Sequence, residues 1–170
     1  IGLIPKTAKA SPLLLFKGTT YPADNGFYLS LLTDINPLGA VGSFAFQRFG
    51  KGKIESWLAK QAQEHDKVEV LGASLGGSLS LQTAATYPKY IKSVHAFNSP
   101  GVSFEEVALW GKSEEKPEVN VYLQEGDPIS SFVGRCFACD WKIHQVFVPK
   151  ISSAQVHAST YTAHPEVFII

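Results

Sequence analysis

The chain has 170 residues, of which 45% are hydrophobic and 18% are charged. This length and composition are typical of one packed domain and not of a disordered chain. Fifteen Lys and Arg residues balance fifteen Asp and Glu residues, so the formal net charge is zero. This balance excludes the basic surface that nucleic-acid-binding proteins need. No apolar run reaches the roughly 18 residues of a membrane-spanning helix. We expect a single domain over residues 1–170.

The sequence contains no Met and begins at Ile1. We therefore interpret it as a piece of a longer polypeptide or as a processed product, from which a targeting signal would have been removed. The sequence assigns neither a compartment nor an oligomeric state.

Short apolar runs alternate with longer segments of helical spacing, which is the pattern of β-α-β units. Helices are expected around 54–61, where Ile54, Trp57, Leu58 and Gln61 follow an i, i+3, i+4, i+7 spacing, and over 75–87 and 104–110. The strands are expected at 12–16, 67–71, 92–97, 119–123 and 142–148. This order predicts an α/β fold with a mostly parallel sheet and helices on both faces.

A serine lies where a predicted strand passes into a predicted helix. Residues 72–76 read Gly-Ala-Ser-Leu-Gly, a G-x-S-x-G pattern centred on Ser74. A nucleophilic serine needs such a tight turn to project its Oγ above the sheet, and the flanking glycines let strand and helix pass closely. The amide of Leu75 would begin the helix and donate to a developing oxyanion. The alternative is a turn of small residues that serves packing alone.

A serine nucleophile also needs an acid and a base, which follow it in the order acid, then histidine, in this kind of fold. Asp127 follows the predicted strand 119–123, at the strand end where ligand-facing residues of open α/β sheets collect. The other interpretation of Gly126-Asp127-Pro128 is turn chemistry. Glu125 is the second candidate for the acid.

Five histidines are candidates for the base. His157 and His164 both follow the last predicted strand, and the loop length favours His157, with His164 as the alternative base. His65 precedes the strand that carries the serine and is expected at the wrong end of the sheet. His95 and His144 lie inside predicted strands and are expected to be core or sheet-face residues.

Four stretches of the sequence resemble the class 3 lipase family of α/β-hydrolases. Residues 14–19 (LLFKGT) are similar to the family's strand ending in F-R-G-T, and 70–77 (VLGASLGG) to its G-H-S-L-G-G turn. Residues 96–101 (AFNSPG) are similar to its T-F-G-S-P segment, and 126–129 (GDPI) to its D-P-V segment. The resemblance implies a small or truncated α/β-hydrolase-like fold.

The resemblance also implies roles for individual residues. It implies Ser74 as the nucleophile, Asp127 as the residue that orients the histidine, and Thr19 with the Leu75 amide as the oxyanion hole. The chain departs from the pattern at Lys17, where the family has Arg, and at Ala73, where it has His. Neither position belongs to the triad. An apolar stretch at 21–32 is either a lid over an acyl pocket or a core helix.

Cys136 and Cys139 form a C-x-x-C pattern. A redox pair would need a helix N-terminus in a thioredoxin-like unit, and a zinc site would need two further ligands at suitable spacing. We expect two buried or partly buried thiols instead. The predicted chemistry requires no cofactor and no metal.

The sequence therefore predicts a serine hydrolase that cleaves carboxylic esters, with a lipid or other ester as substrate and no nucleic acid as partner. Contact with a membrane surface, the substrate class, and transfer of the acyl group to an alcohol in place of water are left open. The alternative function is a hydrolase-fold module without catalysis that binds a lipid or a protein partner.

Overall fold

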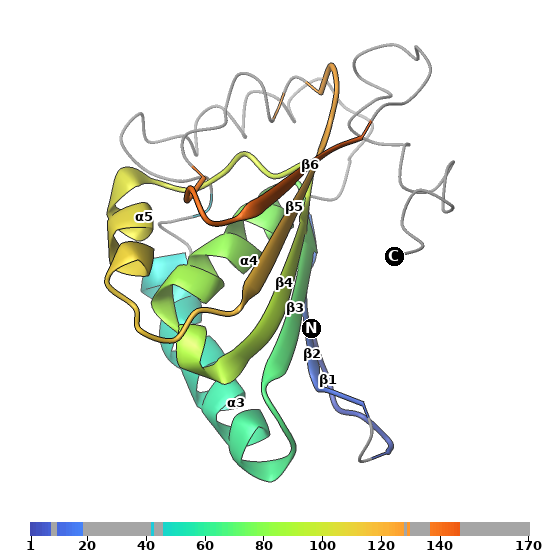
Figure 1. Cartoon of the computed structure of the whole chain (residues 1–170). Coiled ribbons are helices and arrows are strands. Elements are labelled where there is room, and N and C mark those ends of the chain that lie inside the picture. Colours follow the sequence, from blue (N-terminus) through green and yellow to red (C-terminus); the bar gives the residue numbers. More distant parts are fainter. Residues whose placement is uncertain (8–9, 19–41, 43–45, 128, 130–136, 147–170) are drawn as a thin grey trace.

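The computed structural model describes residues 1–7, 10–18, 42, 46–127, 129 and 137–146 (Figure 1). Its centre is a six-stranded sheet whose strands lie in chain order. The first pair of neighbouring strands is antiparallel and the other four pairs are parallel, which confirms the predicted mostly parallel sheet. The strands are β1 (Gly2–Leu3), β2 (Leu13–Phe16), β3 (Val68–Ala73), β4 (Ile91–Phe97), β5 (Glu118–Gln124) and β6 (Lys142–Val146).

The predicted strands agree with the observed ones to within one or two residues, apart from the end of the last. Residues 147 and 148, predicted to end that strand, lie outside the described residues. The sequence did not predict β1, because a two-residue strand is too short to carry an alternating pattern. β1 pairs with β2 through Gly2 opposite Leu14 and Leu3 opposite Leu13.

The helices follow the strands in the order expected for β-α-β units. The helical elements are η1 (Phe46–Gly50), α3 (Lys51–Glu64), α4 (Leu75–Thr86), η2 (Pro88–Tyr90) and α5 (Phe104–Gly111). Parallel strands in chain order joined by right-handed crossovers place their helices on one face, and α3, α4 and α5 all lie there (Figure 1). The predicted α/β-hydrolase-like class is confirmed. In the part of the chain that the structure describes, no helix covers the second face.

Helix α4 is the central helix of the layer. Nine of its twelve residues are buried, because it packs against the sheet and also against α5. Several of its hydroxyl side chains bond to the preceding turn of the helix. Ser80 Oγ donates to the Gly76 carbonyl at 2.8 Å and Thr83 Oγ1 to the Leu79 carbonyl at 2.7 Å. The helix that follows the candidate nucleophile is therefore packed on more than one side.

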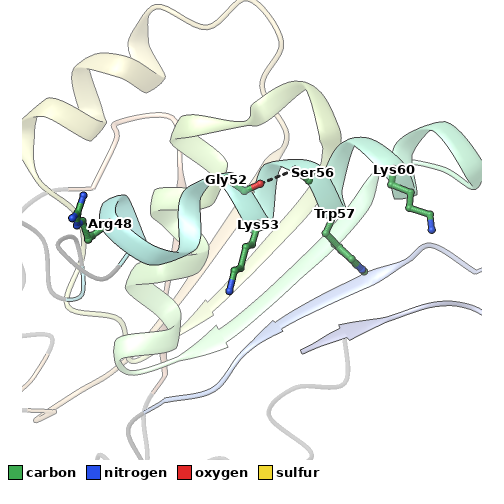
Figure 2. Close-up of a pocket in the computed structure, with 6 residues that line it drawn as sticks. All are labelled: Arg48, Gly52, Lys53, Ser56, Trp57 and Lys60. Carbon is green, nitrogen blue, oxygen red and sulfur yellow. Dashed lines mark hydrogen bonds between the residues drawn. The ribbon is translucent and has the colours of Figure 1, made fainter.

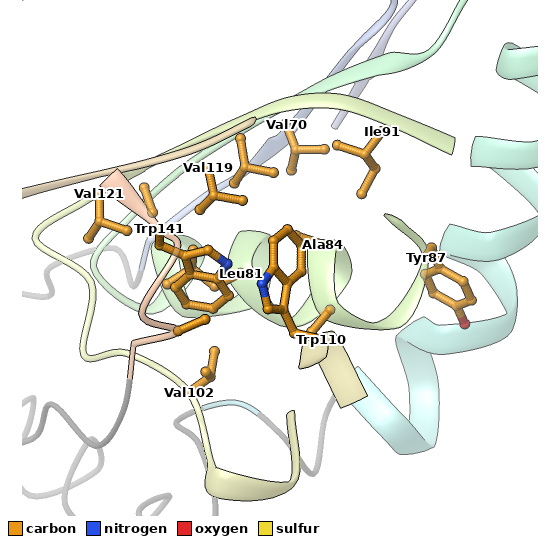
Figure 3. Packing of buried hydrophobic residues seen from close by; sticks show 14 of the residues in the cluster. Val70, Leu81, Ala84, Tyr87, Ile91, Val102, Trp110, Val119, Val121 and Trp141 are labelled. Carbon is orange, nitrogen blue, oxygen red and sulfur yellow. The ribbon is translucent and has the colours of Figure 1, made fainter. Parts of the chain in front are cut away.

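The hydrophobic core lies between the sheet and the helices (Figure 3). Alternate strand residues such as Val70, Val94 and Val121 are completely buried. Val70 and Val121 lie on the side of the sheet that carries Leu81 and Ala84 of α4 (Figure 3). Complete burial of one valine or leucine side chain stabilises the folded state by roughly 1.5–3 kcal/mol. Among the described residues, no helix combines the length and the apolar character needed to cross a bilayer.

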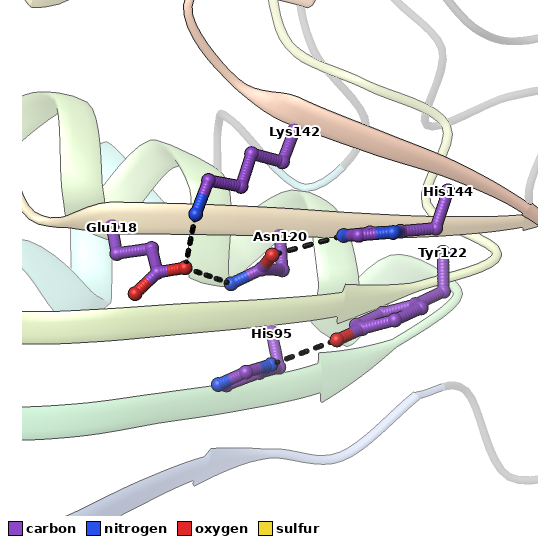
Figure 4. A network of polar contacts seen from close by, with 6 residues as sticks. All are labelled: His95, Glu118, Asn120, Tyr122, Lys142 and His144. Atoms are coloured by element: carbon purple, nitrogen blue, oxygen red, sulfur yellow. Dashed lines mark hydrogen bonds and ion pairs between the residues drawn. The ribbon is translucent and has the colours of Figure 1, made fainter. Parts of the chain in front are cut away.

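The second face of the sheet carries a row of rings across β4, β5 and β6 (Figure 4). The Tyr122 ring stacks on Phe97 at 4.9 Å and on His144 at 4.7 Å between ring centroids. Tyr122 Oη and His95 Nδ1 lie 3.4 Å apart, and His144 Nε2 lies 2.9 Å from Asn120 Oδ1. As expected, His95 and His144 are sheet-face residues.

Candidate active site

Ser74 lies at the turn between β3 and α4, at the carboxyl end of the parallel strands. Its backbone has φ 55° and ψ −125°, a conformation that a residue with a side chain rarely adopts. Its amide donates to the Phe97 carbonyl at the end of β4, with an N···O distance of 2.8 Å. The turn is thus strained and is held by the neighbouring strand, as the sharp turn of a nucleophilic serine requires.

The two motif glycines lie where no side chain fits. A Cβ at Gly72 would collide with the Gly76 carbonyl, and a Cβ at Gly76 would collide with the Phe16 carbonyl of β2. Gly18, which follows β2, approaches the same turn, since a Cβ there would lie 2.8 Å from the Ala73 carbonyl oxygen. These approaches bring the end of β2 directly beside Ser74.

The first amides of α4 lie next to the serine. The helix hydrogen bonds begin with Gly77 N to Ser74 O at 2.9 Å and Ser78 N to Ser74 O at 3.2 Å. Leu75, the first residue of α4, precedes these donors. Its amide is one of the N-terminal helix groups that have no acceptor within the helix. Such an amide is suited to bind a negatively charged oxygen beside Ser74.

Asp127 lies in the turn that follows β5 and has no exposed surface. Its Oδ1 accepts a hydrogen bond from Ile129 N at 2.9 Å, and its own amide donates to the Gln124 carbonyl at 3.2 Å. Gly126, with φ 82°, supplies the left-handed residue that closes this turn. Glu125, the second candidate acid, is exposed. Because β3 and β5 both run parallel to β4, Ser74 and Asp127 both lie at the edge of the sheet where these strands have their carboxyl ends.

The remaining predicted site residues are not all within the described part. Thr19, His157 and His164 lie outside the described residues, as does the apolar stretch 21–32. His65 is the exposed residue that ends α3, just before β3 begins. It therefore lies at the amino end of the strands, the edge opposite Ser74.

The C-x-x-C pattern differs in part from the expectation. Cys139 is a free thiol that is exposed, not buried or partly buried, because it belongs to the turn directly before β6. Cys136 lies outside the described residues. Within the described ranges, no group of three or more His, Cys, Asp or Glu side chains is arranged to hold a metal ion.

A groove of about 750 Å³ runs along α3 (Figure 2). It is lined by Arg48, Gly52, Lys53, Ser56, Trp57 and Lys60. None of these residues is among the predicted site residues, so the groove is a feature separate from the serine turn.

A serine on a strained strand-to-helix turn, above a parallel sheet with an acid after a later strand, is the arrangement of α/β-hydrolases. A family model identifies the family within this class of proteins. Residues 18–135, which are 118 of the 170 residues, match the family "Esterase", described as "Putative esterase". The chain belongs to this esterase family.

Individual proteins match the chain either over a shorter segment or at a lower sequence identity. It is 35% identical over 75 residues to a 2-hydroxy-6-oxo-2,4-heptadienoate hydrolase of Pseudomonas putida strain F1, covering 39% of this chain and 27% of that protein. The chain thus spans little more than a quarter of that relative. A thermostable esterase is 14% identical with a TM-score of 0.41, over 62% of this chain and 31% of the other. A structure from work on the metagenome-derived lipolytic enzymes LipS and LipT is 11% identical with a TM-score of 0.43, over 91% and 88%.

Proposed function

We propose that this protein is a serine ester hydrolase with Ser74 as its nucleophile. The observation that carries the proposal is the strained backbone of Ser74, φ 55° and ψ −125°, at the junction of β3 and α4. A packing turn has no need for a serine in this conformation, which glycine adopts at lower cost. Membership of the esterase family supports the same reaction.

In the proposed mechanism, His157 removes the proton of Ser74 Oγ as the oxygen attacks the ester carbonyl carbon. His164 is the alternative base. The tetrahedral intermediate collapses, the carbon–oxygen bond to the alcohol breaks, and the histidine gives its proton to the departing alcohol. Water then attacks the acyl-enzyme by the same route and releases the acid. Asp127 orients the histidine and stabilises its charged form.

The proposed oxyanion hole is made by the Leu75 amide and by Thr19. The position of Leu75 as the first residue of α4 supports its part. For Thr19 the support comes from its neighbour, because Gly18 lies so close to the turn that a Cβ there would be 3.5 Å from Ser74 Cβ. Loss of one donor of this kind costs on the order of 100- to 1000-fold in kcat.

We further propose that the substrate is a lipid ester. This rests on the resemblance of four stretches to class 3 lipases, which covers the strand before Gly18, the serine turn, the segment after β4 and the Asp127 turn. A series of p-nitrophenyl esters from acetate to palmitate measures the preference. A maximum of kcat/KM at long chains supports a lipid substrate, and a maximum at acetate contradicts it.

The experiment that tests the reaction is labelling of the purified chain with a fluorophosphonate probe. The probe should label the parent protein, and Ser74→Ala should lose both the label and the hydrolysis of p-nitrophenyl butyrate. Ser56→Ala is the matched control, because Ser56 is an exposed helical serine whose hydroxyl bonds only within α3 at 2.8 Å.

Labelling that persists in Ser74→Ala would contradict the assignment of the nucleophile. A parent protein that folds but neither labels nor hydrolyses any ester of the series would favour the alternative, a hydrolase-fold module that binds its partner without catalysis.

A further inference from the structure

The segment that follows β4 connects the serine turn to the turn of Asp127. It comprises Asn98, Ser99, Pro100 and Gly101, all of which are buried. Asn98 is 1% exposed and has φ 45°, the second non-glycine residue with a positive φ besides Ser74 among the described residues. Two strained residues at one edge of a sheet indicate a site whose geometry is held by its surroundings.

Asn98 is bonded to β5 through both its backbone and its side chain. Its amide donates to the Tyr122 carbonyl at 2.8 Å, which continues the ladder between β4 and β5. Its Oδ1 accepts a hydrogen bond from the Gln124 amide at 3.0 Å. Gln124 is the last residue of β5, and its carbonyl in turn accepts from the Asp127 amide at 3.2 Å. A single residue, Gln124, thus joins the Asn98 contact to the turn of the candidate acid.

The other side of this segment is hydrogen-bonded to α4 and to the turn before it. Ser78 Oγ donates to the Gly101 carbonyl at 2.7 Å, inside the protein. Gly77 lies so close to Ser99 that a Cβ at Gly77 would be 2.9 Å from Ser99 Cβ. The Ser74 amide donates to Phe97, directly before Asn98. The segment is therefore attached to α4 on one side and to the end of β5 on the other.

Burial of the Asn98 side chain lowers the stability of the folded protein, because part of its amide has no hydrogen-bond partner in the described part of the chain. Among the described residues, Asn98 Nδ2 and both amide atoms of the Gln124 side chain have no hydrogen-bond partner, although both residues are at least 97% buried. A buried polar atom without a partner costs roughly 1–3 kcal/mol. Within the described ranges, the Asn98 side chain makes one hydrogen bond, in which Oδ1 accepts from the Gln124 amide.

We infer that Asn98 is a positioning residue that holds the end of β5, and with it Asp127, at a fixed place relative to Ser74. The inference rests on the proposed function and deepens it. Asn98 touches no reacting atom in this scheme and acts through Gln124 and Asp127. An asparagine suits the position because it tolerates a positive φ better than most residues and still carries an acceptor.

The test replaces Asn98 by glycine, which keeps the positive φ without strain and removes the acceptor. With p-nitrophenyl butyrate, kcat should fall about 10- to 100-fold while KM changes less than about threefold, since small misplacements of catalytic groups cost this much. The acid limb of the kcat/KM profile should move to lower pH, because a displaced Asp127 no longer stabilises the charged histidine.

Val68→Ala is the matched control for a merely structural effect. Val68 is completely buried at the opposite end of β3, so its truncation lowers stability without touching the segment after β4. Both variants are assayed well below their melting temperatures. Equal kcat and an unmoved pH limb in Asn98→Gly, or the same changes in Val68→Ala, would overturn the inference.

Hydrogen exchange of the Gln124 amide tests the contact independently of activity. In the parent this amide should exchange as slowly as the ladder amides of β5, and in Asn98→Gly it should exchange at least about tenfold faster. Fast exchange in the parent overturns the inference even if Asn98→Gly does not fold. If the parent shows no esterase activity, the proposed function fails, and slow exchange of Gln124 would still uphold the contact itself.

Discussion

At the scale of single residues, the strain at Ser74 has a measurable consequence. A residue with a side chain held at φ 55° and ψ −125° costs roughly 1–3 kcal/mol, and glycine avoids this cost. The greater freedom of glycine in the unfolded chain offsets about 0.4–1 kcal/mol. The free energy of unfolding of Ser74→Gly should therefore be about 1 kcal/mol higher than that of Ser74→Ala, because alanine keeps the strained backbone.

Chemical denaturation of both variants measures this difference. Since neither variant has the hydroxyl, the comparison isolates the backbone from the nucleophile. Equal stability of Ser74→Gly and Ser74→Ala would mean that the turn is not strained, and it would remove the observation on which the proposed function depends.

The sequence predicted Ser74 and Asp127 because each belongs to a local pattern, a G-x-S-x-G turn and a Gly-Asp-Pro turn after a strand. It did not predict Asn98, whose contact with Gln124 joins residues 26 positions apart. Only the pairing of β4 with β5 brings them together. The exposure of Cys139 was also wrongly predicted, because a two-cysteine spacing carries no information about which side of a turn faces the solvent.

At the scale of elements, two helical glycines differ in what surrounds them. Gly76 in α4 faces the Phe16 carbonyl, with which a Cβ would collide. A Cβ at Gly52 in α3 would meet no described atom within 4 Å beyond its chain neighbours and the backbone of its own helix. Gly76→Ala should lower the free energy of unfolding by about 2–3 kcal/mol through overpacking. Gly52→Ala should raise it by about 1 kcal/mol, since alanine is the better helix former.

Urea denaturation of the two variants and the parent checks both signs at once. Gly52→Ala is the matched control, because it makes the same chemical change in a neighbouring helix. A stabilising Gly76→Ala would contradict the close passage of α4 over the end of β2, and with it the tight serine turn.

The elements themselves were largely predictable, and the exceptions have physical causes. The spacing Ile54, Trp57, Leu58 and Gln61 predicted α3, whose buried residues are Leu58 and Gln61. The ends of α3 extend beyond the pattern because exposed residues continue the helix without adding to the apolar face. The short β1 was missed, since only its pairing with β2 defines it.

At the scale of the whole molecule, the two faces of the sheet differ in the part of the chain that the structure describes. The three α-helices of the described residues, α3, α4 and α5, share one face (Figure 1), and the predicted helices of the second face would have to come from residues outside the described ranges. The handedness and the chain order of the strands decide which face α3, α4 and α5 share, and neither follows from the period of a single element. The second face instead carries the polar and aromatic side chains of Figure 4.

That second face links the global stability of the protein to pH through His95. Burial is the main cause that lowers the pKa of His95 below its usual value, and the nearby His144 lowers it further. The carboxylates of Glu69 on β3 and Glu118 on β5 act in the opposite direction but do not cancel the effect of burial. The folded protein therefore favours the neutral ring.

The sign of the effect follows from proton uptake. Below about pH 6.5, the ordinary pKa of histidine, the unfolded chain binds a proton at His95 that the folded protein does not yet bind. The free energy of unfolding should therefore fall as the pH is lowered from about 6.5 through the lower pKa of the folded state. His95→Gln, which cannot titrate, should show a shallower loss of stability over this range.

Denaturant unfolding at several pH values between 8 and 5 measures both slopes, with His65→Gln as the control because His65 is exposed at the end of α3. If the parent and His95→Gln lose stability in parallel as the pH falls, the folded protein does not hold the half-buried His95 ring in its neutral form, and the prediction is wrong.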